Sequence, residues 1–310
     1  MDQTAIACRG KCHFCPECLG FGCIAELPGM GGIRENRNFQ LNCAAWDALP
    51  AEADTELPLI RLAPITGAVE NAGYFEERRF YHDLIQGASE GGAALSIGDG
   101  CPDDKLKYGI EAAASAGKKA AVFIKPYGND KIRERMEWSS GIAEVTGVDI
   151  DSYNIVTMRN LVRLERKTPG MLRELKAASS VPFAVKGVFT GEDIETIREV
   201  KPDIVVVSNH GGRVENREGS TAEFLAGNYR ELRRYVGEIW IDGGIRKPRD
   251  LRAAAVFGVS QVLIGRPFIT ALLRGGPAGV ARYVRELLRA GAQGSLQGYG
   301  KKSGGGRNYR

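Results

Sequence analysis

Short runs of apolar residues alternate with longer stretches in which apolar residues recur every three or four positions, beginning near Leu57. Runs of this length with β-branched residues predict buried strands, and the longer stretches are typical of helices with one buried face. Eight strands are expected, at 59–63, 93–97, 120–124, 145–150, 182–187, 203–208, 238–242 and 261–265. Helices are expected between them, among others at 74–91, 102–117, 190–200 and 247–258.

Strands that alternate with helices pair in parallel and connect through right-handed crossovers. Eight such units favour a (β/α)8 barrel (a TIM barrel), and a doubly wound open sheet is the alternative that the strand count leaves open. The helix at 190–200 begins with Thr190, and Asp193 three residues later completes an N-capping pattern. In a barrel, we expect the residues that carry chemistry to follow the C-terminal ends of the strands.

The ends of the last two predicted strands each place glycine close to arginine. They read DGGIR at 242–246 and GRPF at 265–268, with a helix expected soon after each. Glycine lets backbone N–H groups approach an anion, and a helix N-terminus adds partial positive charge. We therefore expect a phosphate site here, and turn glycines with surface arginines are the alternative. Its residues are Gly244, Arg246, Gly265 and Arg266.

Four segments on predicted strands five to eight carry a family resemblance. PFAVKGV, VVVSNHGGR, IDGGIR and LIGRPF occur in this order, and LAPITGA follows the first strand. Together they resemble the FMN-dependent α-hydroxy-acid oxidoreductases, such as glycolate oxidase and lactate oxidase, over residues 57–300. The resemblance implies an enzyme that uses FMN to oxidise a small 2-hydroxy acid to the 2-oxo acid.

The resemblance also implies residue roles, and general chemistry agrees with them. His210 corresponds to the active-site base, because an imidazole with a pKa near ~6.5 can accept a proton at neutral pH. Arg213 corresponds to the group that binds the substrate carboxylate, for which a guanidinium is well shaped. Lys186 corresponds to the lysine beside flavin N1. Asp242 corresponds to the carboxylate that pairs with the base histidine.

Further contacts are implied in the same way. FMN contacts are expected from Ala63, Pro64, Ile65, Ser96, Lys186, Ser208, Gly211, Asp242, Gly244, Arg246, Gly265 and Arg266. Lys125 and Tyr127, after the third strand, are the expected substrate contacts. Two other functions stay open: a flavin isomerase of the type 2 isopentenyl-diphosphate isomerase kind, and a non-catalytic flavin or metal redox module. The pairing of His210 with Arg213 argues against the isomerase, because that pair suits a carboxylate.

Residues 1–50 are rich in cysteine and glycine and show no clear period, so we expect an irregular extension ahead of a barrel at 51–300 and a flexible tail at 301–310. The spacing of Cys12, Cys15 and Cys18 resembles an iron–sulfur run, with Cys23, or alternatively Cys8, as the fourth ligand. Structural zinc and reduced thiols are the alternatives. A cluster would pass electrons singly to a carrier protein and so favour a dehydrogenase over an oxidase.

The composition is that of an ordinary globular protein: 310 residues, 43% hydrophobic and 26% charged. Much of the net charge of +4 sits in the C-terminal tail, so no nucleic-acid surface is expected. No signal peptide or apolar membrane span is recognisable, which predicts a cytoplasmic protein whose cysteines do not form disulfides. The family resemblance implies a homo-oligomer, a tetramer.

Overall fold

The computed structural model describes residues 36–52, 55–154, 162–214 and 217–299. In that part of the chain, eight strands pair in parallel in the order β1-β8-β7-β6-β5-β4-β3-β2. Their bounds are β1 Leu59–Leu62, β2 Ser96–Gly98, β3 Ala120–Ile124, β4 Ala143–Asp149, β5 Phe183–Val188, β6 Ile204–Val207, β7 Glu238–Asp242 and β8 Gln261–Ile264.

The sheet closes on itself next to β2. The backbone N–H of Leu62 donates to the carbonyl of Ala94 at 2.8 Å, and the N–H of Ala94 donates to the carbonyl of Ile60 at 2.9 Å. These bonds join β1 to the residues just ahead of β2. The predicted (β/α)8 barrel is therefore confirmed, and the open sheet is excluded.

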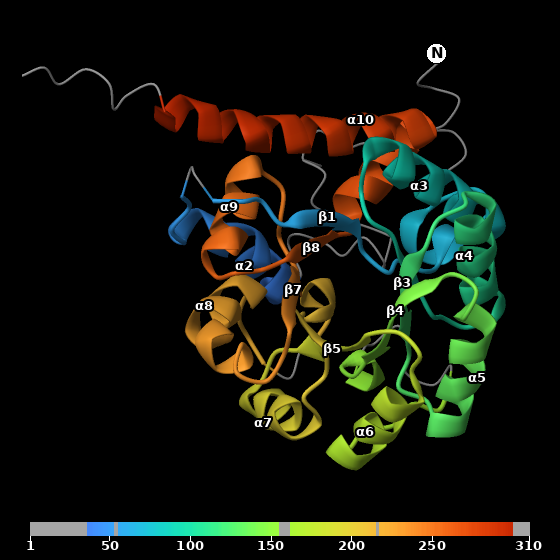
Figure 1. The fold of residues 1–310 in the computed structure, drawn as a ribbon. Helices are drawn as coiled ribbons and strands as arrows, with labels where there is room; N and C mark the ends of the chain where they lie inside the picture. Colours follow the sequence, from blue (N-terminus) through green and yellow to red (C-terminus); the bar gives the residue numbers. More distant parts are fainter. Residues whose placement is uncertain (1–35, 53–54, 155–161, 215–216, 300–310) are drawn as a thin grey trace, which may run out of the picture.

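Helices surround the strands on the outside (Figure 1). They are α2 Arg37–Ala45, α3 Glu77–Gly91, α4 Asp104–Ser115, α5 Asn129–Ser139, α6 Pro169–Ala178, α7 Gly191–Val200, α8 Thr221–Leu232, α9 Pro248–Val256 and α10 Arg266–Tyr299, which is kinked at Gly275 and Gly276. The expected capping box of α7 is present, with Thr190 and Asp193 bonded reciprocally. Among the described helices, none is long and apolar enough to cross a bilayer.

Side chains that point inward fill the barrel. A buried cluster joins six of the strands, and Ala63 packs against it. Its members are Ala121, Phe123, Val145, Ala184, Ile204, Val206, Trp240 and Leu263. Because this packed interior leaves no channel through the barrel, a ligand can bind only at an end of it.

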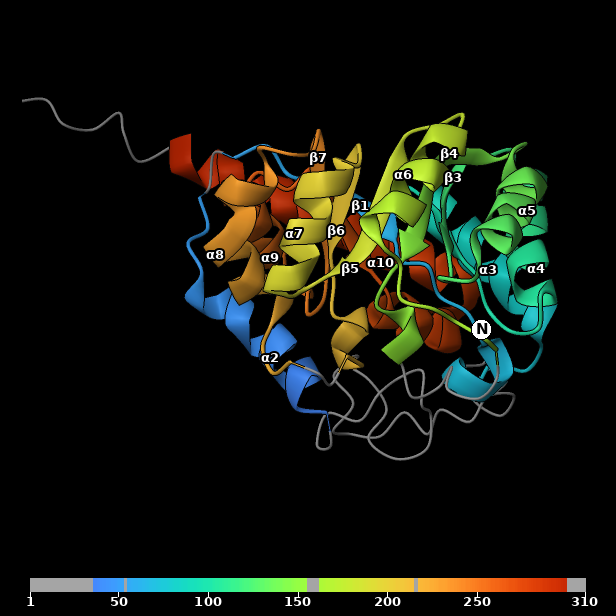
Figure 2. The same cartoon turned by 90° about the horizontal axis from the view of Figure 1, so that it is seen from below.

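Part of the segment expected to be irregular is a helix that belongs to the barrel. Asn36 caps α2 by accepting a hydrogen bond from the N–H of Phe39 at 2.8 Å. Asn42 of α2 donates to Asn209 at 2.8 Å and accepts from the N–H of Thr221 at 3.0 Å. Figure 2 shows α2 at one end of the barrel. The expectation was wrong for residues 37–45 because α2 is stabilised by these distant contacts rather than by a strong apolar period.

Candidate active site

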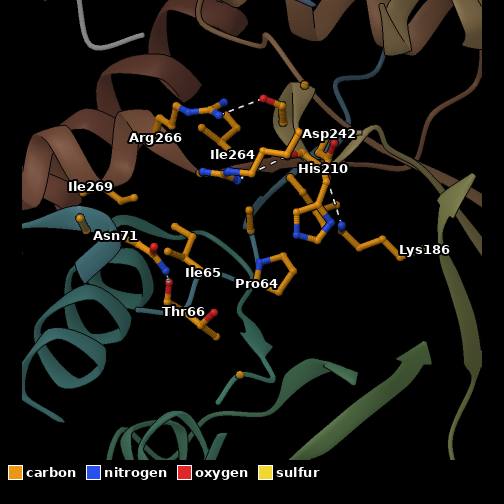
Figure 3. A pocket seen from close by; sticks show the side chains of 18 of the residues that line it. Pro64, Ile65, Thr66, Asn71, Lys186, His210, Asp242, Ile264, Arg266 and Ile269 are labelled. Carbon is orange, nitrogen blue, oxygen red and sulfur yellow. Dashed lines mark hydrogen bonds and ion pairs between the residues drawn. The ribbon is translucent and has the colours of Figure 1, made fainter. Parts of the chain in front are cut away.

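A cavity opens at the C-terminal ends of the strands, where the barrel fold predicted it. Figure 3 shows Arg266 on one side of the cavity, Lys186 on the other, and the segment with Pro64 and Ile65 along one wall. The residues that line it are Ala63, Pro64, Ile65, Thr66, Asn71, Ala72, Gly100, Cys101, Lys105, Lys125, Lys186, His210, Gly211, Arg213, Asp242, Gly243, Gly244, Ile245, Arg246, Leu263, Ile264, Gly265, Arg266 and Ile269.

Three arginines make one side of the cavity strongly positive. The guanidinium of Arg266 donates to the carbonyl of Gly211 at 2.9 Å and lies 4.3 Å from the ring centroid of Phe39. Burial, together with the charges of Arg213 and Arg246, holds the pKa of Arg266 well below its usual range. Such mutual repulsion is relieved when an anion binds. The arrangement therefore fits the predicted phosphate site.

The loop after β7 approaches α2 too closely for any side chain. Gly243 and Gly244 have φ of +99° and +79°, a region that favours glycine. A Cβ atom on Gly244 would lie 1.8 Å from the carbonyl oxygen of Asn42. Glycine at this position is therefore required by both backbone conformation and space.

Replacing Gly244 with alanine is expected to lower the free energy of unfolding by about 3 kcal/mol, because the new methyl group strains the loop and displaces α2. Urea unfolding would measure the loss. Gly227→Ala is the matched control: Gly227 lies in the exposed face of α8, and no described residue comes within 4 Å of its Cβ position. That control should gain about 0.5–1 kcal/mol. Equal stability of Gly244→Ala and the native protein would contradict the tight approach.

Lys186 lies on the opposite side of the cavity, among acidic and polar groups. Its Nζ is 3.0 Å from Asp149 Oδ1, 3.2 Å from Ser208 Oγ and 3.5 Å from Asp242 Oδ2. Burial opposes its charge, but the carboxylates of Asp149 and Asp242 raise the pKa of Lys186 above its usual value. A lysine buried on a strand keeps its charge only beside an anionic partner, and these carboxylates supply that partner.

Lys125 binds the other oxygen of the same carboxylate. Its Nζ lies 3.1 Å from Asp149 Oδ2 and 3.0 Å from Ser152 Oγ. Burial favours the neutral form of Asp149, but the charges of Lys186 and Lys125 hold its pKa well below the usual value. Lys125 lines the cavity, so its predicted contact with substrate stays a prediction.

The imidazole of His210 faces the end of β4. Its Nδ1 lies 3.1 Å from Asp151 Oδ1 and 3.6 Å from Asp149 Oδ2. Burial, together with the nearby charges of Lys186, Lys125 and Arg213, holds the pKa of His210 well below its usual value. The ring is therefore neutral at pH 7 and can accept a proton, as the predicted base must.

The expected pairing of Asp242 with His210 is corrected by the structure. Asp242 Oδ2 accepts a hydrogen bond from the hydroxyl of Ser208 at 2.7 Å and faces Lys186, whereas His210 faces the carboxyl groups of Asp149 and Asp151. The hydroxyl of Ser208, two residues before the histidine, and the ammonium of Lys186 both face the same oxygen of Asp242, Oδ2. Its other oxygen, Oδ1, is buried with no hydrogen-bond partner among the described residues.

Three other predicted contacts lie away from the cavity lining. Ser96 begins β2 instead of ending it, because that strand starts three residues later than expected, and Gly100 and Cys101 line the cavity instead. Tyr127 is turned away, and its ring packs beneath Lys131 and Arg135. Ser208 does not line the cavity, but its hydroxyl group forms hydrogen bonds with Lys186 and Asp242, which do.

Sequence reasoning missed two groups of residues. Asp149 and Asp151 were not assigned roles, although two acidic residues that end an apolar strand were a usable signal. The second group also lines the cavity and consists of Thr66, Asn71, Ala72, Gly100, Cys101, Lys105, Gly243, Ile245, Leu263, Ile264 and Ile269. The predicted metal ligands Cys12, Cys15, Cys18 and Cys23 lie outside the described residues.

One family of known proteins matches more than half of this chain. A family described as FMN-dependent dehydrogenase matches residues 118–304. The 2-hydroxyacid oxidase of Dictyostelium discoideum is 39% identical over 116 residues, which are 37% of this chain and 30% of that protein. The pre-mycofactocin synthase of Mycobacterium tuberculosis is 36% identical over 137 residues, which are 43% of this chain and 33% of that protein. The matched segments thus span about a third of the length of each relative.

Solved structures resemble most of this chain in fold. The flavin-binding domain of baker's yeast flavocytochrome b2 matches with a TM-score of 0.68 and 20% identity, over 85% of this chain and 75% of that chain. Mandelate oxidase with benzoyl-formic acid matches with a TM-score of 0.67 and 20% identity, over 85% of each chain. At this identity, the likeness concerns the fold.

Proposed function

The chain belongs to the FMN-dependent dehydrogenase family, and from this premise we propose that it binds FMN and oxidises a small 2-hydroxy acid to the 2-oxo acid. The observation that carries the proposal is that His210, Arg213 and Lys186 line one cavity with a positive side suited to phosphate. These groups match what the reaction requires: a base, a carboxylate-binding cation and a buried cation beside the electron acceptor.

The residues of the cavity fit FMN. Arg246 and Arg266 with the backbone at Gly244 and Gly265 would hold its phosphate, and Pro64 and Ile65 would lie along its ring. The unpartnered Oδ1 of Asp242 would accept a hydrogen bond from a ligand hydroxyl. When bound, FMN supplies the two-electron acceptor of the reaction.

This chain's own side chains would then bind and orient the substrate. Burial lowers the pKa of Arg213 to about 10, which leaves the guanidinium charged at neutral pH and able to hold a carboxylate. The neutral imidazole of His210 accepts the proton that the substrate loses, and the nearby carboxyl groups stabilise the imidazolium that forms. Lys186 holds a positive charge where negative charge develops during reduction.

An anaerobic screen of 2-hydroxy acids tests the proposal. The purified protein should release FMN on denaturation, and glycolate, lactate or mandelate should bleach its flavin absorbance with one equivalent of 2-oxo acid formed. Acetate and propionate, which lack the hydroxyl group, are the matched controls and should cause no bleaching. A protein without FMN would contradict the cofactor, and a flavin reduced by dithionite but by no 2-hydroxy acid would contradict the substrate class.

The predicted route by which electrons leave the flavin involves four cysteines that lie outside the described part of the chain. An iron–sulfur cluster at Cys12, Cys15, Cys18 and Cys23, with zinc as the alternative, stays a prediction. So do the electron-carrier partner, the tetramer and the cytoplasmic location. A chain with a cluster would use a carrier protein rather than oxygen as its main acceptor.

A further inference from the structure

Two carboxyl groups at the end of β4 share one small, buried site, and they have different partners. Asp149 has each oxygen within 3.1 Å of a lysine ammonium, from Lys186 on β5 and from Lys125 after β3. Its approach to His210, at 3.6 Å, uses the oxygen that Lys125 already binds. A carboxylate bound on both oxygens by ammonium groups is a weak acceptor for a further donor.

Asp151 makes the closer approach to the imidazole. Its Oδ1 lies 3.1 Å from His210 Nδ1, and its side chain is only 6% exposed. The space that it occupies exists because residue 187 is glycine: a Cβ atom on Gly187 would lie 2.6 Å from Asp151 Cγ. The fold thus reserves room for this second carboxyl beside the ring nitrogen.

We propose that Asp151, rather than Asp149, is the positioning residue of His210: it accepts the hydrogen bond of the Nδ1–H group and so leaves Nε2 as the nitrogen that takes the substrate's proton. This role rests on the proposed function, in which His210 is the base. Asp149 keeps a separate task, which is to neutralise Lys125 and Lys186. A histidine whose Nδ1–H is held by a carboxyl group has a fixed tautomer and ring orientation.

Titratable groups from five neighbouring parts of the barrel surround Asp151. Asp149 lies on β4, Lys125 after β3, Lys186 on β5, His210 after β6 and Asp242 at the end of β7. Burial and the charge of Asp149 raise the pKa of Asp151 well above its usual value, and a protonated carboxyl at this position still accepts from Nδ1–H through its carbonyl oxygen. The positive charge of an imidazolium favours ionisation of Asp151, which then stabilises the protonated base.

The test is Asp151→Asn, which keeps the size of the side chain and removes the carboxyl group. We expect kcat to fall about 100-fold or more, because an amide can also donate to Nδ1 and so admits the wrong tautomer. KM and FMN content should stay within about twofold, since Arg213 and the phosphate site are unchanged. Loss of the ionisable partner also destabilises the imidazolium, so the acid limb of kcat/KM should move to lower pH. A kcat within twofold of the native value would overturn the proposal.

Nuclear magnetic resonance of 15N-labelled histidine gives a readout that needs no turnover. The chain has only three histidines, so His210 is assigned by comparison with His210→Ala. In the native holoprotein we expect the Nδ1-protonated tautomer, and in Asp151→Asn a mixture of tautomers. A native spectrum with the Nε2-protonated tautomer would overturn the proposal even where Asp151→Asn does not fold. Failure of the substrate screen would leave this result unchanged, so the two proposals fail separately.

Asp83→Asn is the matched control for burying an amide in place of a carboxyl. Asp83 is 5% exposed on α3, where it accepts from the Tyr74 hydroxyl at 2.6 Å and from Arg79 at 2.8 Å. We expect reduced stability and unchanged tautomer and pH profile. If Asp83→Asn shifted the pH profile as Asp151→Asn does, the effect would be one of general destabilisation, and the positioning role of Asp151 would be wrong.

Discussion

Replacing His210 with alanine is expected to leave FMN bound and to slow flavin reduction by about 10²- to 10⁴-fold. The variant lacks the group that accepts the substrate's proton, whereas the arginines that face the phosphate site are unchanged. Stopped-flow absorbance under anaerobic conditions measures the rate directly, and release of FMN on denaturation measures its content.

The control for this variant is His82→Ala. His82 lies on α3, where its Nε2 is 3.5 Å from Glu111, outside the cavity lining. Its removal should leave flavin reduction unchanged. A His210→Ala protein that reduces its flavin at the native rate would show that another group is the base.

The same histidine sets the acid limit of activity. Only its neutral form can act as the base, and burial holds its pKa well below the usual ~6.5. As the pH falls, activity should therefore persist below pH 6.5 and disappear only near the lowered pKa. A profile of kcat/KM against pH checks this, and loss of activity above pH 6.5 with one proton taken up would contradict the assigned environment.

Replacing Lys186 with methionine is expected to lower the free energy of unfolding by about 3–5 kcal/mol, because it removes one partner of a buried charge pair. The carboxylate of Asp149 would keep Lys125 but lose the ammonium 3.0 Å from its Oδ1. Urea unfolding at pH 7 measures the loss. The matched control is Lys119→Met, whose exposed ammonium contacts only the carbonyl of Gly141 among the described residues and should change stability by less than about 0.5 kcal/mol.

The loss in Lys186→Met should also depend on pH. The pKa of Asp149 is held below its usual value, so this carboxylate stabilises the native fold above pH ~4 and the contribution disappears as the pH falls through the lowered pKa. Without Lys186 that pKa rises, and the variant should begin to lose stability at a higher pH than the native protein. A variant within about 1 kcal/mol of the native protein at both pH 7 and pH 5 would show that the pair contributes little.

Much of the architecture could be predicted from the sequence because it depends on local periods. Seven of the eight strands begin within two residues of their expected positions, and the capping box at Thr190 forms as predicted. The exception is β2, where Ala94 joins β1 by an isolated bridge and the regular strand begins only at Ser96. Strand starts depend on pairing with a neighbour, which a local pattern does not contain.

The sequence by itself determined the barrel and the end of the barrel that carries the chemistry. It also determined which glycine, lysine, histidine and arginine residues lie at that end, because each strand end and the residues that follow it are adjacent in the sequence. Only the tertiary structure decided which charges meet. In the folded protein, His210 lies beside the carboxyl groups of Asp149 and Asp151 rather than that of Asp242. The ring of Tyr127 packs against Arg135 and not into the cavity, and α2 lies against Gly244. These pairings join residues that are far apart in sequence, and they depend on ångström-scale geometry at the barrel's mouth that no local period encodes.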